Sequence, residues 1–228
     1  MPSIELSAGT IDYQDTGGGG PVLLLSHGLP MTGTQWRKVV PELAGYRCIL
    51  PTLPLGGHRR PMNPDADLSQ RGVALLLAEF VDRLGLDDVT LVLNDWGGGQ
   101  FLISEGRAER IGRLVLVACE AFDNFPPGPA RPLSTLCRIP GAVWLLAHLM
   151  RVKAVRRSRR GYGGMSLRGL PDEILLDWFA PLASDRAIRR DFARFATSTP
   201  PASTLLAWSE RLREYERPVL VLWADQDT

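Results

Sequence analysis

The stretch LVLNDWGGG, residues 91–99, decides the fold. Its apolar start predicts a strand buried on both faces, as in a parallel sheet. Glycines follow at once and open a helical pattern, so strand passes to helix within two residues. Such a sharp turn lifts one side chain, Asp95, above the sheet edge at the positive end of the helix. Small residues are needed beside it because the backbones pack closely.

Asp95 stands where such an elbow usually carries serine or cysteine, and no GxSxG motif occurs in the chain. A carboxylate at this point can attack an sp3 carbon and form an ester, which water then hydrolyses. The alternative is that Asp95 only caps the helix, since aspartate is a favoured N-cap residue. The following Trp96, Gly97 and Gly98 and a second loop favour the nucleophile.

That second loop is Ser26–Pro30, directly after the apolar run 21–25. A backbone N–H just past Gly28 is expected to pair with the N–H of Trp96 as an oxyanion hole. Two such donors stabilise the charge that develops during ester hydrolysis. We expect His27 to hold the loop; the alternative is a role as base.

Working outward, strand-like runs alternate with helical patterns. We expect a hairpin at 4–7 and 10–14, strands at 21–26, 48–50, 89–93, 114–118 and 219–223, and helices at 68–84 and 98–110. This alternation predicts an α/β fold, a mostly parallel sheet with helices on both faces. Strand signals then stop, and helical stretches follow at 143–155, 172–179 and 185–196. The predicted organisation is a core at 1–121, an inserted helical cap at 122–208, and the core continued at 209–228.

Together, the two loops resemble the α/β-hydrolase fold family, in its branch with an aspartate nucleophile. That branch holds haloalkane dehalogenases and epoxide hydrolases, and the resemblance covers the whole chain, with the insertion as cap. It implies Asp95 as nucleophile, the backbone N–H groups of Leu29 and Trp96 as oxyanion hole, and the Trp96 indole as leaving-group donor. The remaining motif positions are structural: His27, Gly28, Pro30, Gly97 and Gly98.

The carboxylate that orients a catalytic histidine has two candidates from the same resemblance. Glu120 follows the strand at 114–118, and Asp227 follows the strand at 219–223, with Asp225 a weaker third. The family's histidine lies past the position of Asp227, and neither His58 nor His148 matches it. The resemblance therefore implies a fragment of a longer hydrolase, without the last strand and helix. The alternative is a protein that ends here, which is expected to form the ester and hydrolyse it slowly.

The substrate is less determined than the nucleophile. Leu29 cannot donate from its side chain as the asparagine of some dehalogenases does. Trp144 and Trp178 are the cap's candidate second halide donors, each with cap core as the alternative, and Tyr162 is its candidate epoxide donor. The residues favour a haloalkane dehalogenase. The alternatives are an epoxide, ester or C–C hydrolase, and a non-catalytic binding protein of the same fold.

Composition excludes other classes. The chain has 228 residues, 45% of them apolar, and a formal net charge of +1. That balance argues against nucleic-acid and membrane-surface proteins. Three cysteines and three histidines without a CxxC motif predict no metal, and we expect no cofactor. We expect a small apolar substrate and water as partners and a cytoplasmic location, because no secretory signal opens the chain. A basic set with only Lys38 and Lys153 as lysines suggests a bacterial gene.

Overall fold

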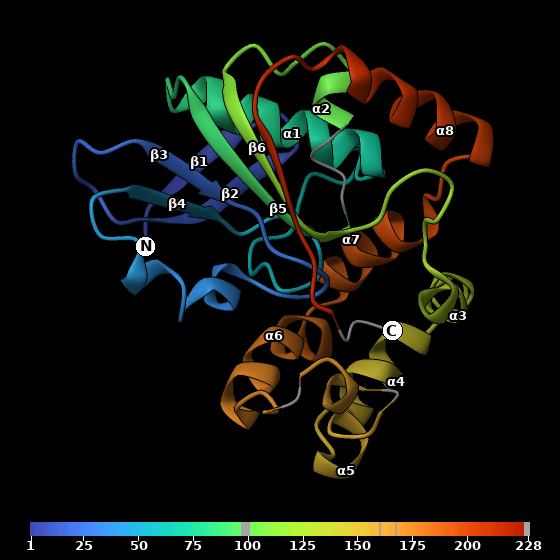
Figure 1. Cartoon of the computed structure of the whole chain (residues 1–228). Coiled ribbons are helices and arrows are strands. Elements are labelled where there is room, and N and C mark those ends of the chain that lie inside the picture. Colours follow the sequence, from blue (N-terminus) through green and yellow to red (C-terminus); the bar gives the residue numbers. More distant parts are fainter. Residues whose placement is uncertain (97–100, 160, 167, 226–228) are drawn as a thin grey trace.

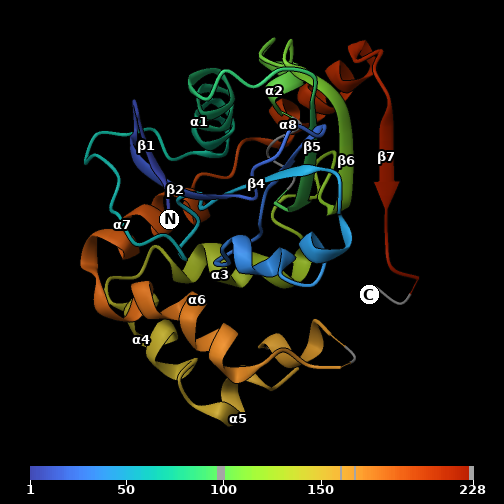
Figure 2. The same ribbon diagram turned by 90° about the vertical axis from the view of Figure 1, so that its left-hand side faces the viewer.

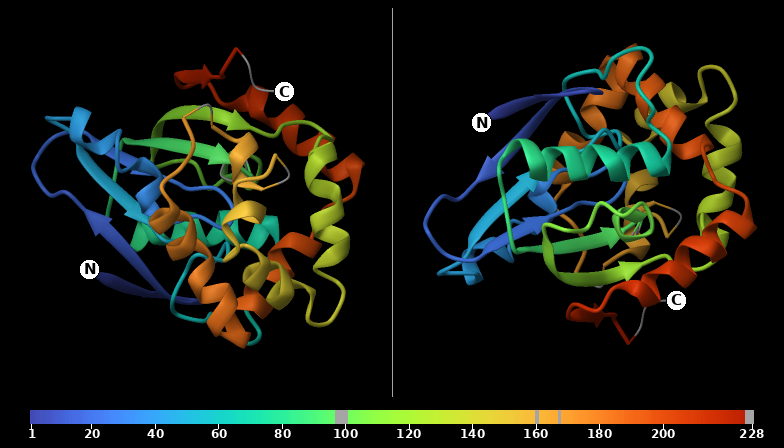
Figure 3. Two further views of the ribbon diagram at one scale, coloured as in Figure 1. Left: turned by 90° about the horizontal axis from the view of Figure 1, so that it is seen from below. Right: turned by 90° about the horizontal axis from the view of Figure 1, so that it is seen from above.

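A seven-stranded sheet organises the chain. The computed structural model describes residues 1–96, 101–159, 161–166 and 168–225. The strands lie in the order β1-β2-β4-β3-β5-β6-β7, which sets β1 and β7 at opposite edges (Figure 3). Their bounds are β1 Ser3–Leu6, β2 Gly9–Asp15, β3 Val22–Leu25, β4 Arg47–Pro51, β5 Val89–Asp95, β6 Ile111–Cys119 and β7 Val219–Leu222.

The predicted pairing is present. β1 and β2 form the antiparallel hairpin, and β2 pairs antiparallel with β4. The strands from β4 through β3, β5 and β6 to β7 are all parallel. Parallel neighbours bring their carboxyl ends to one edge of the sheet, so the loops after β3, β5 and β6 meet there. That edge is where both loops found in the sequence lie.

Helix α1, Gln70–Arg83, matches the helix predicted at 68–84. Ser69 caps its start by accepting a hydrogen bond from the N–H of Gly72, and the stripe from Val73 to Val81 is buried in the core. The helix predicted at 98–110 is described only as α2, Phe101–Ser104, because residues 97–100 lie outside the described part. Its predicted end was wrong, since Gly106 turns the chain at a φ of +66°.

Apolar side chains fill both faces of the sheet. One face packs Leu24, Ile49 and Leu91 against α1, α2 and α8, the last spanning Ala202–Arg211. The other face holds a smaller cluster around Trp36, which comes from the 3-10 helix η1, Gly33–Trp36. Figure 1 shows α1, α2 and α8 together at one end of the molecule and α4 to α6 at the other.

The segment expected to form the cap, 122–208, is helical with a cluster of its own around Trp178, Phe179 and Phe192. The helix predicted at 143–155 is interrupted at 150–152, and the one predicted at 172–179 continues to Ser184. Figure 2 shows α3 to α6 on the side toward which β7 runs, the carboxyl edge of the sheet. The helices are α3 Arg131–Leu136, α4 Ala142–Leu149, α5 Lys153–Arg156, α6 Asp172–Ser184 and α7 Arg186–Thr197.

The smaller 3-10 turns are η2 Val40–Glu42, η4 Gly128–Ala130, η5 Tyr162–Gly164 and η6 Leu212–Glu214. The sequence missed α3 and α8 because prolines precede both and their apolar stripes are short. None of the helices in the described ranges has the length and apolar character that a membrane crossing needs.

Candidate active site

Asp95 ends β5 in a backbone conformation that few residues other than glycine adopt. Its φ is +68°, and the pairing of β5 with β6 shifts register between Asn94 and Asp95. A positive φ at a residue with a side chain is uncommon and strained, and it concentrates at functional sites. The strand-to-turn geometry expected of a nucleophile elbow is therefore present at the expected residue.

The loop Ser26–Pro30, here called the oxyanion loop, lies directly against Asp95. The backbone N–H of Leu29 donates to Asp95 Oδ2 at 2.8 Å. A Cβ built on Gly28 would lie 2.6 Å from the same oxygen, so only glycine fits at this position. The contact supplies the expected Leu29 donor at the nucleophile, while the backbone N–H of Trp96 stays a prediction.

His27 holds the oxyanion loop and has no nitrogen left for proton transfer. It is fully buried, its Nε2 accepts the backbone N–H of Leu53 at 2.9 Å, and its Nδ1 lies 2.9 Å from the carbonyl oxygen of Gly28. The accepting Nε2 requires the proton on Nδ1, which donates to that carbonyl. Burial lowers the pKa of His27 to about 4, which keeps the ring neutral.

Two carboxyl groups meet at the ends of β5 and β6. The backbone N–H of Glu120 donates to the carbonyl oxygen of Asp95 at 3.2 Å. Burial raises the pKa of Asp95 to about 6, against the opposing hydrogen bond from Leu29. Burial and then the charge of Asp95 raise the pKa of Glu120 to about 8. The two buried carboxyl groups therefore bind a proton more tightly than exposed ones do, and together they favour one shared proton over two charges.

Of the two candidate acids that the structure describes, Glu120 lies beside Asp95 and Asp225 does not. Asp227 lies outside the described residues, as do Gly97 and Gly98. Asp225 is exposed beyond the end of β7. The geometry therefore favours Glu120 among the carboxylates whose position is described.

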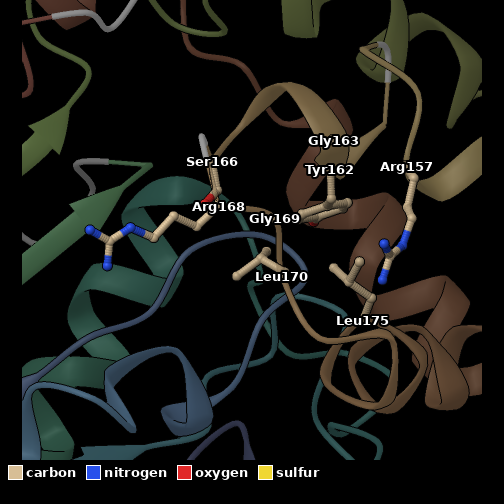
Figure 4. A pocket seen from close by; sticks show the side chains of 8 residues that line it. All are labelled: Arg157, Tyr162, Gly163, Ser166, Arg168, Gly169, Leu170 and Leu175. Carbon is tan, nitrogen blue, oxygen red and sulfur yellow. The ribbon is translucent and has the colours of Figure 1, made fainter.

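Tyr162 reaches the oxyanion loop from the cap segment. Its hydroxyl donates to the carbonyl oxygen of Leu29 at 3.0 Å, and its ring contacts Phe179 edge-on at 5.6 Å. Burial and then the charge of Asp95 raise the pKa of Tyr162, so the phenol stays protonated. Tyr162 also lines a cavity of about 300 Å³ within segment 122–208, together with Arg157, Arg168, Leu170 and Leu175 (Figure 4).

The two candidate tryptophans of segment 122–208 lie in different surroundings, and their role as leaving-group donors stays a prediction. Trp178 is 1% exposed, and its indole N–H donates to Thr34 Oγ1 at 2.7 Å, so its donor is already used. Trp144 is 46% exposed on α4, where its ring lies 4.2 Å from that of His148. Trp96, in contrast, is buried next to the nucleophile and packs edge-on against Phe195 of α7.

The other two histidines lie in different surroundings. His58 is buried, and its Nε2 lies 3.3 Å from Asp191 Oδ2 on α7. His148 has its Nδ1 2.8 Å from the carbonyl oxygen of Trp144. Neither contact involves the carboxyl group of Asp95. No group of His, Cys, Asp or Glu within the described ranges is arranged to hold a metal ion.

Two residues at the site were missed from the sequence. Gln35 accepts the backbone N–H of Gly28 at 2.9 Å, and its amide nitrogen donates to Asn94 Oδ1. A polar Asn94 at the end of an otherwise apolar strand was the one available signal. Nothing in the sequence connects it to Gln35, which lies 59 positions earlier.

The arrangement offers a buried carboxyl group, Asp95, with a backbone donor on one oxygen, a second carboxyl group from Glu120 beside it, and the phenol of Tyr162 hydrogen-bonded to the loop. Such a set can displace a leaving group and stabilise the oxyanion of a later hydrolysis step.

Comparisons with known proteins agree with this chemistry. Residues 22–228 match the model of the alpha/beta hydrolase family. A haloalkane dehalogenase of Mesorhizobium japonicum is 32% identical over 60% of this chain and 46% of its own length. Haloalkane dehalogenase 2 of Mycobacterium tuberculosis is 29% identical over 90% of this chain and 75% of its own. The crystal structure of a putative ancestral haloalkane dehalogenase covers 99% of this chain and 81% of its own, with a TM-score of 0.72 and 25% identity.

Proposed function

Because the chain belongs to the alpha/beta hydrolase family and is similar to haloalkane dehalogenases, we propose that it cleaves a carbon–halogen bond of a small apolar substrate through Asp95. The carboxylate attacks the halogen-bearing carbon, an ester forms, and the halide leaves with the bonding electron pair. Water then cleaves the ester, which releases the alcohol and a proton and restores the carboxylate. The hydrogen bond from Leu29 to Asp95 Oδ2 carries this proposal.

Each neighbour of Asp95 has a role in the proposed reaction. The N–H of Leu29 stabilises the oxyanion of the hydrolysis step, together with that of Trp96. The buried indole of Trp96 receives the leaving halide in the proposed reaction. Glu120 is the proposed triad acid, with Asp227 as the alternative. We propose that 122–208 acts as a cap that excludes water from the site.

Epoxide opening is the second candidate function, and Tyr162 supports it. Its phenol keeps its proton and lies one hydrogen bond from the oxyanion loop. A phenol in that position can protonate the oxygen of an epoxide as Asp95 attacks the ring carbon. Carbon–halogen cleavage and epoxide opening use the same proposed nucleophile, Asp95. They differ in the group that takes the bonding electrons, which is a halide in the first and the epoxide oxygen in the second.

Intact mass measurement after incubation with 1-bromobutane tests the proposal. We expect a gain of one butyl group, located on Asp95 by peptide mapping and lost in Asp95→Asn. The adduct should persist in this chain, because the histidine rings described above are engaged elsewhere.

A parallel sample with 1,2-epoxybutane separates the candidates. Addition of a hydroxybutyl group without butyl addition would replace the dehalogenase assignment by epoxide opening. A chain that near-UV circular dichroism shows to be folded and that adds neither group would overturn both candidates and favour an ester or C–C hydrolase or a binding protein of this fold.

We also propose a cytoplasmic location, with a small apolar molecule and water as the only reaction partners. Cys48 and Cys137 are buried free thiols, the state that a reducing compartment maintains. Peptide mass mapping of an unreduced, denatured sample should find both Cys48 and Cys137 as free thiols, which would support that location. A mixed disulfide at either position would oppose it.

A further inference from the structure

Three consecutive side chains of η1 bind three different parts of the molecule. Thr34 accepts the indole N–H of Trp178 from the cap segment. Trp36 donates from its own indole to the carbonyl oxygen of Ser26, at the start of the oxyanion loop, at 3.1 Å. Gln35, between them, contacts the loop and β5. This short helix therefore lies where the cap, the oxyanion loop and the nucleophile strand meet.

The amides of Gln35 and Asn94 form a chain of hydrogen bonds with one direction. Gly28 donates its N–H to Gln35 Oε1 at 2.9 Å, and Gln35 Nε2 donates to Asn94 Oδ1. Asn94 Nδ2 then donates to the carbonyl oxygen of Val117 on β6 at 2.8 Å. Each amide accepts through oxygen and donates through nitrogen, so the main-chain groups at both ends determine its orientation.

This series of hydrogen bonds begins at Gly28, the residue that packs against Asp95. The Cα of Gly28 lies so near Asp95 that a Cβ would overlap its carboxyl group, and the next N–H donates to the same group. A shift of the Gly28 peptide therefore moves the Leu29 donor relative to Asp95 Oδ2. We call this series of hydrogen bonds, from Gly28 through Gln35 and Asn94 to Val117, the relay. Asn94 directly precedes Asp95 in the sequence.

We infer that Gln35 and Asn94 are positioning residues, which hold the oxyanion loop at hydrogen-bond distance from the nucleophile and touch no reacting atom. The inference rests on the proposed function, because its consequence is a rate. Misplacement of a catalytic donor by about 1 Å can cost about a hundredfold in rate. A residue that only stabilises the fold would leave the rate constant of the folded enzyme unchanged.

The test compares Gln35→Met and Asn94→Leu, which remove the amides and keep side-chain volume, and their double variant. Gln70→Met is the matched control. Gln70 is fully buried in α1, and its amide has no hydrogen-bond partner among the residues that the structure describes. The rate of butyl transfer from 1-bromobutane to Asp95 is followed by intact mass, against substrate concentration and pH.

We expect each relay variant to lower the saturating alkylation rate about tenfold or more, with the half-saturating concentration changed less than about twofold. The double variant should lose no more than the stronger single variant, since both break one chain of bonds. The acid limb of the pH profile should move to higher pH, because the weakened Leu29 bond is the contact that opposes the rise in the Asp95 pKa. Gln70→Met should leave all three quantities unchanged.

Amide hydrogen exchange of the oxyanion loop gives a second measurement, which does not depend on alkylation of Asp95. The amides of Gly28 and Leu29 should exchange faster in Gln35→Met and Asn94→Leu than in the wild type or in Gln70→Met. Unchanged exchange together with an unchanged saturating rate would overturn the relay. If the wild type adds no alkyl group but its loop loosens in both variants, the proposed reaction fails and the relay remains. Two variants on different elements keep the test valid if one of them does not fold.

Discussion

β5 and β7 flank the same strand, β6, and both pair parallel with it, yet their surroundings are opposite. Leu91 of β5 is 1% exposed, whereas Leu220 of β7 is 52% exposed. β5 has a second partner in β3 and helices packed on one face. In the described residues, β7 has β6 as its one partner strand, and all four of its side chains are exposed.

The contrast separates two properties that an apolar run does not distinguish. The runs at 89–93 and 219–223 are both mostly apolar, VTLVL and VLVLW, and both were predicted as strands of the parallel sheet. Strand formation was right for both, because β-branched and leucine side chains suit a pleated strand. Burial differs between the two strands, because it depends on what other elements cover a strand. The end of β5 is consequently a preorganised site, and the end of β7 is open.

The largest expected effect comes from making the same truncation on both strands. Leu91→Ala should lower the free energy of unfolding by about 3 kcal/mol, the usual cost of a cavity in a packed core. Leu220→Ala should change it by less than about 0.5 kcal/mol, because the side chain already meets solvent. Urea unfolding followed by circular dichroism gives both values. Equal costs would remove the contrast between the strands.

Close packing at the end of β5 gives the next effect. Gly28→Ala places a methyl group 2.6 Å from Asp95 Oδ2 and should slow alkylation of Asp95 about tenfold to a hundredfold, since overpacking costs about 1–3 kcal/mol. Gly19→Ala is the control, because no atom lies within 4 Å of its Cβ position. A Gly28→Ala variant that reacts at the wild-type rate would show that the loop can retreat freely.

The buried carboxyl groups of Asp95 and Glu120, at the ends of β5 and β6, predict that the stability of the fold depends on pH. In the folded chain the pKa values of Asp95 and Glu120 lie at about 6 and about 8, above their ordinary values of 3.8 and 4.5. The folded state therefore binds these protons more tightly than the unfolded state, and stability falls as the pH rises through about 4 to 8. Asp95→Asn should flatten the fall, and urea unfolding at pH 5 and pH 8 measures it. A slope of the same size in the variant would place the proton uptake elsewhere.

The smallest effect is expected on β7. Val221→Lys puts a charge on an exposed apolar edge strand, which opposes pairing between copies. We expect a higher monodisperse fraction in size-exclusion chromatography and a free energy of unfolding within about 0.5 kcal/mol of the wild type. Wild-type chain that is already monodisperse at high concentration would show that this edge is protected in another way.

Much of the fold was predictable because strand and helix periodicity are local properties of the sequence. The hairpin, the five further strands and α1 follow from runs of three to seventeen residues. Asp95 and the oxyanion loop were predictable for a related reason, since each is a short motif at the end of a strand. The break at 150–152 was missed because residues 143–155 are apolar and basic throughout, with no glycine or proline to mark it.

The rest depends on which way a side chain turns once the elements pack. Trp144 and Trp178 carry the same indole on neighbouring helices, but one faces solvent and the other donates to Thr34. Gln35 and Asn94 meet only because η1 folds back against the end of β5. Such pairings are long-range contacts, which local pattern does not encode.

One buried carboxylate bears on how this molecule could be recombined with its relatives. Asp191 on α7 accepts the backbone N–H of Met62 at 2.8 Å, contacts His58, and is held by the guanidinium of Arg190, which also donates to the carbonyl oxygen of Met62. This attachment joins the helical segment to the loop after β4. A chimera that receives helices 122–208 from another member must therefore bring a carboxylate to the place of Asp191. Without that carboxylate, the backbone N–H of Met62 and the Nε2 of His58 would stay buried and lose their hydrogen-bond partner, which lowers the stability of the chimera.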